Sequence, residues 1–287
     1  MQEQKITLKN IESFNLEHIF ECGQCFRWNK NEDDSYTGIV KQNVINIKTE
    51  NNKIYVKSYG KDDLKELFDF YFDMDRDYES IKKELRKIDE NMRNSISYGE
   101  GIRLLNQDLW ETIISFIISA NNNIPRIKGI IERISKRFGN KIEWNGKEYY
   151  TFPTPEQLGK ASVEDLRNLG LGFRDIRVYE TTQLVLNEKV DFEKLHSEEN
   201  TEIVREELLK LPGVGPKVAD CILLFSTLKR FDVFPIDVWV RRVMNDLYIH
   251  KADENKVDKK LVLNIANEKF GDLQGIAQQY LFYWKRG

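Results

Sequence analysis

A lysine and an aspartate twenty residues apart are the two side chains of this 287-residue sequence best suited to do chemistry together. Lys217 belongs to LPGVGPKVADCILLF, residues 211–225, and stands at the start of a helical pattern whose following residues are nearly all apolar. An amine with apolar neighbours can act as a nucleophile toward an electrophilic carbon. The alternative is a lysine that simply extends into solvent from the first turn of a helix.

Asp237 lies in VFPIDVWVRRVM, residues 233–244, directly before a second helical pattern. An aspartate in this position is typical of an N-cap, and a cap requires no functional explanation. If the preceding segment RFDVFP returns in an extended conformation, however, Asp237 would lie beside Lys217 at the mouth of one cleft. An amine paired with a carboxylate is an arrangement used in nucleophilic catalysis.

The segment LKLPGVGPK, residues 209–217, predicts a helix, a tight turn and a new helix with Pro216 in its first turn. We expect glycine conformations at Gly213 and Gly215, and a helix-hairpin-helix at about residues 201–228. The backbone amides of such a turn, with the N-terminus of the next helix, favour binding of an anion such as a nucleic-acid phosphate. An ordinary corner between two helices, without a ligand, is the alternative.

Composition restricts the class of protein. The sequence is 40% hydrophobic and has no apolar run of the roughly 18 residues that a bilayer requires. Its N-terminus, MQEQKITLKN, does not have the basic-then-apolar order of a signal peptide, so we expect a cytoplasmic protein without membrane contact. The net charge of −3 is unevenly distributed along the chain, because residues 61–80 contribute −5 and the remaining residues sum to +2. A local neutral or basic face that binds nucleic acid is compatible with that distribution.

The hydrophobic pattern changes from β to helical along the chain. The segments NVINIKTE and NKIYVKSY, residues 43–50 and 52–59, alternate apolar and polar residues and predict an antiparallel hairpin. After Gly60 the pattern is helical to the end of the chain. We therefore predict an α+β protein with a β-rich N-terminal domain, residues 1–100, and a helical domain, residues 101–287.

Five motifs, in order along the chain, resemble one family. The hairpin with Lys217 and Asp237 resembles the helix-hairpin-helix-GPD superfamily of DNA base-excision glycosylases. Four further stretches are similar to the 8-oxoguanine DNA glycosylase/AP lyase family: GQCFRW at 23–28, QDLWETIISFIISANNNIPRI at 107–127, GLGFR at 170–174 and GIAQQYLF at 275–282. This family combines an antiparallel β domain, similar to TATA-binding protein, with a helical glycosylase core.

The resemblance implies a bifunctional enzyme of base excision repair. Lys217 would attack the sugar carbon, displace the oxidised base and form a Schiff base that permits β-elimination, while Asp237 would deprotonate the amine. The Gly23 carbonyl would accept the N7 hydrogen that distinguishes 8-oxoguanine from guanine. Cys221 and Phe282 would sandwich the flipped base, and Gln278 would bind its Watson-Crick edge. Core packing is the alternative role for these last residues.

The resemblance also implies a partner, double-stranded DNA containing 8-oxoguanine, bound by a monomer. Asn121, Arg126 and Arg174 would bind the estranged cytosine, although Asn121 is also a plausible helix end and the two arginines could be solvated. No cofactor is required, but the hairpin would hold a monovalent or divalent cation. The remaining implied sites are DNA contacts at Phe173, Gly213, Gly215 and Trp239, and cation-binding carbonyls at Leu209, Leu211 and Val214.

Two sequence features of this chain differ from the family pattern. Many members have a tyrosine where this chain has Phe173, and a histidine where it has Trp239.

The three cysteines, Cys22, Cys25 and Cys221, exclude the four-cysteine cluster of the endonuclease-III-like branch. A non-catalytic DNA-binding module that keeps only the hairpin is the alternative function, and it has no need of Lys217 and Asp237 together.

Overall fold

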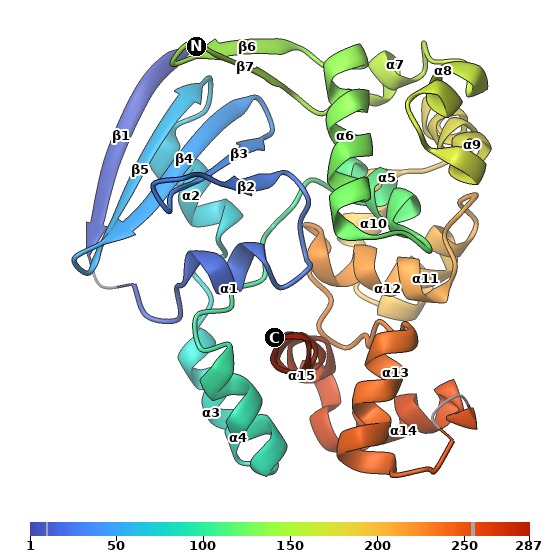
Figure 1. The fold of residues 1–287 in the computed structure, drawn as a ribbon. Coiled ribbons are helices and arrows are strands. Elements are labelled where there is room, and N and C mark those ends of the chain that lie inside the picture. The colour runs from blue at the N-terminus through green and yellow to red at the C-terminus, as the bar shows by residue number, and fades with distance from the viewer. Residues whose placement is uncertain (10, 254–255) are drawn as a thin grey trace.

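The computed structural model describes residues 1–9, 11–253 and 256–287, and its N-terminal part is a five-stranded antiparallel sheet (Figure 1). The order of the strands in the sheet is β1-β5-β4-β3-β2. The predicted hairpin is confirmed: β4 and β5 pair in register and are joined at Asn51 and Asn52, which both have positive φ. The strands are β1 (Gln2–Lys9), β2 (Trp28–Lys30), β3 (Tyr36–Val40), β4 (Asn43–Glu50) and β5 (Lys53–Gly60).

One face of this sheet is covered by aromatic side chains from two helices, α1 (Leu16–Phe20) and α2 (Leu64–Tyr71). Trp28 is 1% exposed, and its ring stacks on Phe20 with 4.1 Å between the ring centroids. Its indole N–H donates a 3.0 Å hydrogen bond to the hydroxyl of Tyr71. The N-terminal domain therefore has a hydrophobic core of its own.

The rest of the chain is mostly helical, and short polar side chains begin most of its helices. Asn123, for example, caps α6 by accepting a hydrogen bond from the amide of Arg126, and Ser162 forms a capping box at α8. The helices are α3 (Tyr78–Arg86), α4 (Glu90–Tyr98), α5 (Leu109–Ser119), α6 (Ile124–Phe138), α7 (Pro155–Leu158), α8 (Val163–Asn168), α9 (Asp175–Leu186), α10 (Phe192–Ser197), α11 (Thr201–Leu209), α12 (Pro216–Phe225), α13 (Val238–Met244), α14 (Lys259–Phe270) and α15 (Gln274–Arg286), with short helical turns η1 (Gly172–Arg174), η2 (Asn245–Ile249) and η4 (Gly271–Leu273). No helix in the described ranges is long and apolar enough to cross a membrane.

The expectation that the chain is helical from Gly60 to its end is wrong at one place. A two-stranded hairpin, β6 (Lys141–Trp144) and β7 (Lys147–Tyr150), follows α6 and extends toward the N-terminal sheet (Figure 1). Its turn is Asn145-Gly146, and both residues have positive φ, as a tight two-residue hairpin requires. Ile142 and Trp144 pack against Val44 of β4, so the hairpin joins the helical domain to the sheet.

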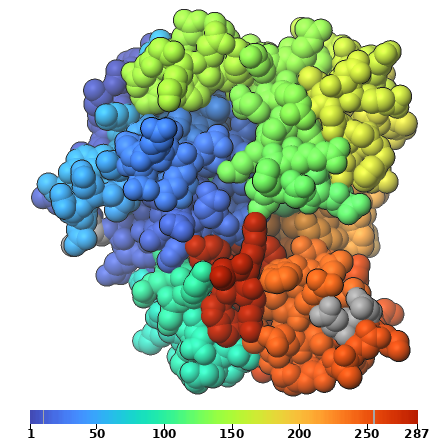
Figure 2. All heavy atoms as spheres, in the orientation of Figure 1, coloured from blue at the N-terminus to red at the C-terminus, as the bar shows by residue number. Residues whose placement is uncertain are grey.

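The last helix, α15, connects segments from both ends of the chain. It packs against α4 on one side and against α13 and α14 on the other. Figure 2 shows this helix (red) between the segment that contains α3 and α4 (teal) and the segment that contains α13 (orange). The side chains of α15 therefore face neighbours that are distant in sequence.

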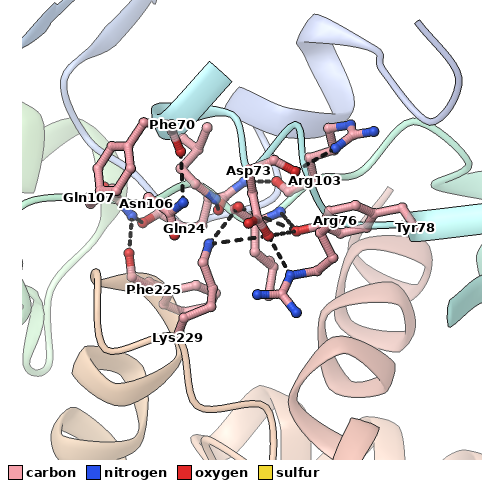
Figure 3. Close-up of polar contacts among 12 residues, drawn as sticks. Gln24, Phe70, Asp73, Arg76, Tyr78, Arg103, Asn106, Gln107, Phe225 and Lys229 are labelled. Carbon is pink, nitrogen blue, oxygen red and sulfur yellow. Dashed lines mark hydrogen bonds and ion pairs between the residues drawn. The ribbon is translucent and has the colours of Figure 1, made fainter. Parts of the chain in front are cut away.

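A buried polar network forms the junction between the two domains (Figure 3). Arg103 donates hydrogen bonds of 2.9 Å to the carbonyls of Ser13 and Asp73. Lys229, from the loop after α12, donates a 2.7 Å hydrogen bond to the carbonyl of Leu104, and burial lowers its pKa to about 7. These contacts join the residues before α5 to both domains.

Replacing Trp28 with alanine tests the N-terminal core. Loss of a buried aromatic ring typically lowers the free energy of unfolding by about 3–5 kcal/mol, because it leaves a cavity. We expect that loss for Trp28→Ala, measured by urea unfolding. Trp239→Ala is the matched control, since Trp239 is 39% exposed, and it should cost less than about 1 kcal/mol. Equal losses would contradict the packing described here.

Candidate active site

One cavity brings together the two chemically suited side chains and four other predicted site residues. It is lined by Gly23, Lys217, Cys221, Asp237, Gln278 and Phe282, and its volume is about 350 Å³ including its open mouth. Two of its walls follow from helical spacing. Lys217 and Cys221 are four residues apart on α12, and Gln278 and Phe282 are four apart on α15, so each pair lies on one helix face.

Lys217 lies in the first turn of α12 and follows the N-cap Gly215 and Pro216 in the sequence. It is half-buried, and its Nζ lies 5.5 Å from the centroid of the Phe116 ring on α5. Within the described ranges, no carboxylate lies within ion-pair distance of this amine. The amine therefore faces an aromatic wall and the cavity, as a nucleophile requires.

Asp237 is the N-cap of α13, and its Oδ1 accepts a 2.7 Å hydrogen bond from the amide of Val240. The capping interpretation is therefore confirmed. The segment that precedes it, residues 228–237, is irregular and without helix, and it returns Asp237 to the cavity that Lys217 lines. Because the cap uses one carboxylate oxygen, the carboxylate can hold its position while its second oxygen serves another partner.

Gly23 lies in the loop after α1 and has a φ of +87°, a conformation that side chains disfavour. A Cβ at this position would also lie 3.4 Å from Cε1 of Phe282. The backbone conformation favours glycine, and a Cβ would add contact with the cavity wall at Phe282. An alanine here would disturb the loop as well as the cavity, so Gly23→Ala cannot test the two roles separately.

The walls of the cavity combine apolar surface with one unsatisfied polar atom. Burial raises the pKa of the Cys221 thiol to about 11, although the nearby Lys217 lowers it. Gln278 is 5% exposed, and its Oε1 has no hydrogen-bond partner within the described structure. An unpaired buried acceptor costs about 1–3 kcal/mol. A ligand in the cavity that donates to Gln278 would remove this cost.

The turn of the helix-hairpin-helix joins α11 to α12. Gly213 has a φ of +89°, as expected, and a Cβ there would lie 3.0 Å from Cγ2 of Ile117. The expectation of a glycine conformation at Gly215 is wrong: its φ is −94°. A Cβ at Gly215 would meet nothing within 4 Å, so the backbone beside the first turn of α12 is open to an approaching partner.

The hairpin turn also contains the carbonyls expected to bind a cation. Leu209 ends α11, and Leu211 and Val214 lie in the turn that follows. The carbonyl of Leu211 accepts a 3.0 Å hydrogen bond from the amide of Val214. A carbonyl oxygen has two lone pairs, so this bond leaves one for a cation. Backbone oxygens at a turn suit a hard cation, and this site remains a prediction.

A second group of predicted residues lies beyond the ends of α5 and α8. Phe173 is 55% exposed, and the guanidinium carbons of Arg174 and Arg177 lie 4.2 and 5.2 Å from its ring centroid. Asn121 has a positive φ just after the end of α5, so the helix-end interpretation is confirmed. This group therefore presents an exposed aromatic ring supported by arginines.

The two arginines predicted to bind the estranged base differ in environment. Arg126 is exposed and donates one hydrogen bond of 3.3 Å to the carbonyl of Gly170. Arg174 is buried, which makes the solvated alternative wrong for this residue. Its guanidinium donates to the carbonyls of Ala120, Asn121 and Leu171. Arg174 thus holds the end of α5 in place beside Phe173.

Comparisons with known proteins agree with the site. A model for the N-terminal domain of 8-oxoguanine DNA glycosylase matches residues 6–113, and a model for HhH-GPD superfamily base excision DNA repair proteins matches residues 114–267. The chain belongs to the HhH-GPD superfamily of base excision DNA repair proteins. The resemblance drawn from the motifs is therefore confirmed, as is the fold of an antiparallel sheet domain on a helical HhH-GPD core.

Relatives in the family are similar over most of their length. A Methanothermobacter thermautotrophicus protein named as a probable N-glycosylase/DNA lyase is 33% identical and covers 83% of this chain and 81% of its own. The N-glycosylase/DNA lyase of Arabidopsis thaliana is 28% identical over 92% of this chain and 75% of its own. The Clostridium acetobutylicum 8-oxoguanine glycosylase/lyase, in complex with double-stranded DNA, is 41% identical, with a TM-score of 0.92 and coverage of 99% and 97%. The chain is thus a DNA-repair glycosylase/lyase.

Several residues of this glycosylase site were not predicted. Phe116 faces Lys217, and Gln279 lies in the cavity wall beside Gln278. In the sequence, Phe116 is one of many apolar residues in a buried helix, and no feature distinguishes it. Gln279 could have been identified from the sequence, because a second glutamine in the middle of an apolar helical run requires a buried hydrogen-bond partner.

Asp237→Asn separates the capping role of this residue from a role in the chemistry. Asparagine caps helices as well as aspartate does, so we expect the free energy of unfolding to change by only a few tenths of a kcal/mol. If Asp237 takes part in the chemistry, lyase activity at an abasic site should fall about 100-fold or more, because an asparagine amide cannot act as a general base. Asp258→Asn, at the N-cap of α14, is the matched control and should leave activity unchanged. An Asp237→Asn variant with full activity would show that the residue is only a cap.

Proposed function

We propose that this glycosylase/lyase excises 8-oxoguanine from double-stranded DNA and cleaves the strand through a Schiff base on Lys217. The observation that carries the proposal is the cavity in which Gly23, Lys217, Cys221, Asp237, Gln278 and Phe282 meet. The Clostridium acetobutylicum relative, described with cytosine opposite to 8-oxoG in its DNA, supports the same substrate class. A base must leave the stack to reach such a cavity.

Lys217 supplies the nucleophile. Its amine attacks C1′ of the flipped nucleotide, and the electron pair of the glycosidic bond leaves with the base, which takes up a proton. Ring opening of the sugar then gives a Schiff base between C1′ and Nζ. Loss of a proton from C2′ expels the 3′ phosphate by β-elimination, and water releases the lysine.

Asp237 acts as the base that removes a proton from the Lys217 ammonium. Its anchored carboxylate also stabilises positive charge that develops on the sugar as the glycosidic bond breaks. The capping bond to Val240 keeps the carboxylate in one orientation. Because the Lys217 amine lies beyond ion-pair distance of any carboxylate within the described ranges, the lysine side chain closes this distance when the nucleotide binds.

The base is recognised by one backbone carbonyl and one side-chain amide. The Gly23 carbonyl accepts the N7 hydrogen of 8-oxoguanine, a donor that guanine does not have. Gln278 binds the Watson-Crick edge, and this contact satisfies its unpaired Oε1. Cys221 and Phe282 stack on the two faces of the base. A guanine would leave the Gly23 carbonyl buried and unpaired, at a cost of about 1–3 kcal/mol.

The surrounding DNA is held by the second group of residues and by the hairpin. Phe173 enters the space that the flipped base leaves, and Asn121 and Arg126 bind the estranged cytosine, while the buried Arg174 holds the backbone of Asn121 in position for that contact. Trp239, which is partly exposed beside Asp237, donates its indole N–H to a phosphate. The amides of residues 213–215 bind a second phosphate, with a cation at the carbonyls of Leu209, Leu211 and Val214. The enzyme acts as a monomer on the cell's DNA.

Lys217→Gln tests the assignment of the nucleophile. Glutamine is neutral and polar, with a similar reach, so we expect release of 8-oxoguanine and strand cleavage to be lost while binding to the duplex changes little. Single-turnover assays and a binding titration measure the two effects. Lys87→Gln is the control, because it removes one charge from an exposed ion pair with Glu84 at the C-terminal end of α3. Base release at the wild-type rate by Lys217→Gln would exclude the proposed nucleophile.

A further inference from the structure

The loop that carries Gly23 is held on both sides by glutamine amides from other parts of the chain. Nε2 of Gln279, on α15, donates to the carbonyl of Cys22. Nε2 of Gln107, directly before the cap of α5, donates to the carbonyl of Gln24 at 2.8 Å. The two carbonyls that flank Gly23 are therefore both occupied, by donors 172 positions apart in the sequence.

The side chain of Gln24 prevents rotation of the same loop. It is fully buried, and its amide donates 2.8 Å hydrogen bonds to the carbonyls of Ile19 and Arg103. Its Oε1 accepts from the amide of Leu105 at 2.8 Å. With both ends of the side-chain amide paired, a turn of the loop about Gln24 would break three buried hydrogen bonds.

The Gly23 carbonyl differs from its two neighbours. Within the described ranges no donor is paired with it, and Gly23 itself lines the cavity. Of these three consecutive carbonyls, two accept hydrogen bonds from glutamines, and the third, without a partner in the described ranges, belongs to a residue that lines the cavity. This is the arrangement expected of a backbone acceptor whose direction is set for a ligand.

Gln107 also determines how far this loop lies from the catalytic helix. The same Nε2 donates 2.9 Å to the carbonyl of Phe225, the last residue of α12 (Figure 3). One amide therefore bridges the loop of Gly23 and the helix of Lys217 and Cys221. A shift of either element would break a hydrogen bond to the other.

We propose that Gln279 and Gln107 are positioning residues for base discrimination, which hold the Gly23 carbonyl in line with the N7 hydrogen of the oxidised base. They do not touch the reacting atoms. Their amides instead fix the peptide groups on both sides of the acceptor. This inference rests on the proposed excision of 8-oxoguanine, and it predicts a larger effect on the base-dependent step than on the reaction at an abasic site.

The test compares two reactions of Gln279→Met and Gln107→Met, which keep side-chain length and remove the donors. Single-turnover release of 8-oxoguanine should fall at least about tenfold, the equivalent of one hydrogen bond of about 1.4 kcal/mol. β-Elimination at a pre-formed abasic site should stay near the wild-type rate in Gln279→Met, because no base has to be recognised. In Gln107→Met it should fall less than base release does, because this variant also loses the bond to Phe225 on α12. Any residual preference for 8-oxoguanine over guanine should fall by the same factor.

Gln274→Met is the matched control. Gln274 lies on the same helix as Gln279, is buried, and donates a 2.7 Å hydrogen bond to the carbonyl of Asp232, away from the loop of Gly23. It should leave the ratio of the two rates unchanged. Thermal melting of all three variants measures the structural cost of removing a buried amide.

The possible results separate this inference from the function on which it rests. If the wild type releases no 8-oxoguanine, the proposed substrate is wrong and the inference falls with it. If the wild type is active but both reactions fall together in the variants, the glutamines are only structural and the inference alone is overturned. A Gln274→Met variant with the same change of ratio would overturn it as well. Two independent positions keep the test decisive if one variant does not fold.

Discussion

The hydrogen bonds that hold residues 22–24 between the two domains are the constraint on which the active site depends. Gly23 belongs to the N-terminal domain, whereas the other predicted cavity residues come from helices of the second domain. Without Gln24, Gln107 and Gln279, the wall at Gly23 would be free to move relative to α12 and α15. The β domain therefore contributes directly to the catalytic cavity.

Some residues of the site stabilise the fold, whereas others have polar atoms without a hydrogen-bond partner. Asp237 stabilises α13 as its cap, so a residue of the proposed chemistry also contributes to folding. Gln278 has the opposite character, because its buried Oε1 has no hydrogen-bond partner among the described residues. Apolar side chains, including Phe116 and Phe282, line the cavity beside Lys217, where a Schiff base would form. Asp237 is thus fixed by its helix cap, whereas Gln278 has an acceptor that is available to a ligand.

Local signals in the sequence were sufficient to predict the elements that carry the site. Alternation predicted the β4–β5 hairpin, and the turn LPGVGPK predicted the junction of α11 and α12, with Lys217 in the first turn of the second helix. The hairpin β6–β7 was missed because its strands are only four residues long and charged, although Asn145-Gly146 between them is a strong turn signal.

Contacts between distant segments could not be predicted in the same way. Periodicity identifies Phe116 as a buried helical residue, but only the packing of α5 against α12 places its ring beside Lys217. Gly215 has the extended backbone of an N-cap, which is indistinguishable in sequence from a glycine that needs positive φ. The burial of Arg174 similarly depends on carbonyls at the end of a helix some fifty residues earlier. The positions of Gln107 and Gln279 are long-range properties of the same kind.

The role of Lys217 as nucleophile is tested most directly by locating the residue that becomes covalently linked to DNA. Incubation with an 8-oxoguanine duplex in the presence of borohydride would reduce the Schiff base to a stable amine, and digestion with peptide mass mapping would find the modified residue. We predict a single sugar adduct on the peptide that contains Lys217. An adduct on the N-terminal amine or on another lysine, or efficient base release without any adduct, would contradict the central role assigned to Lys217.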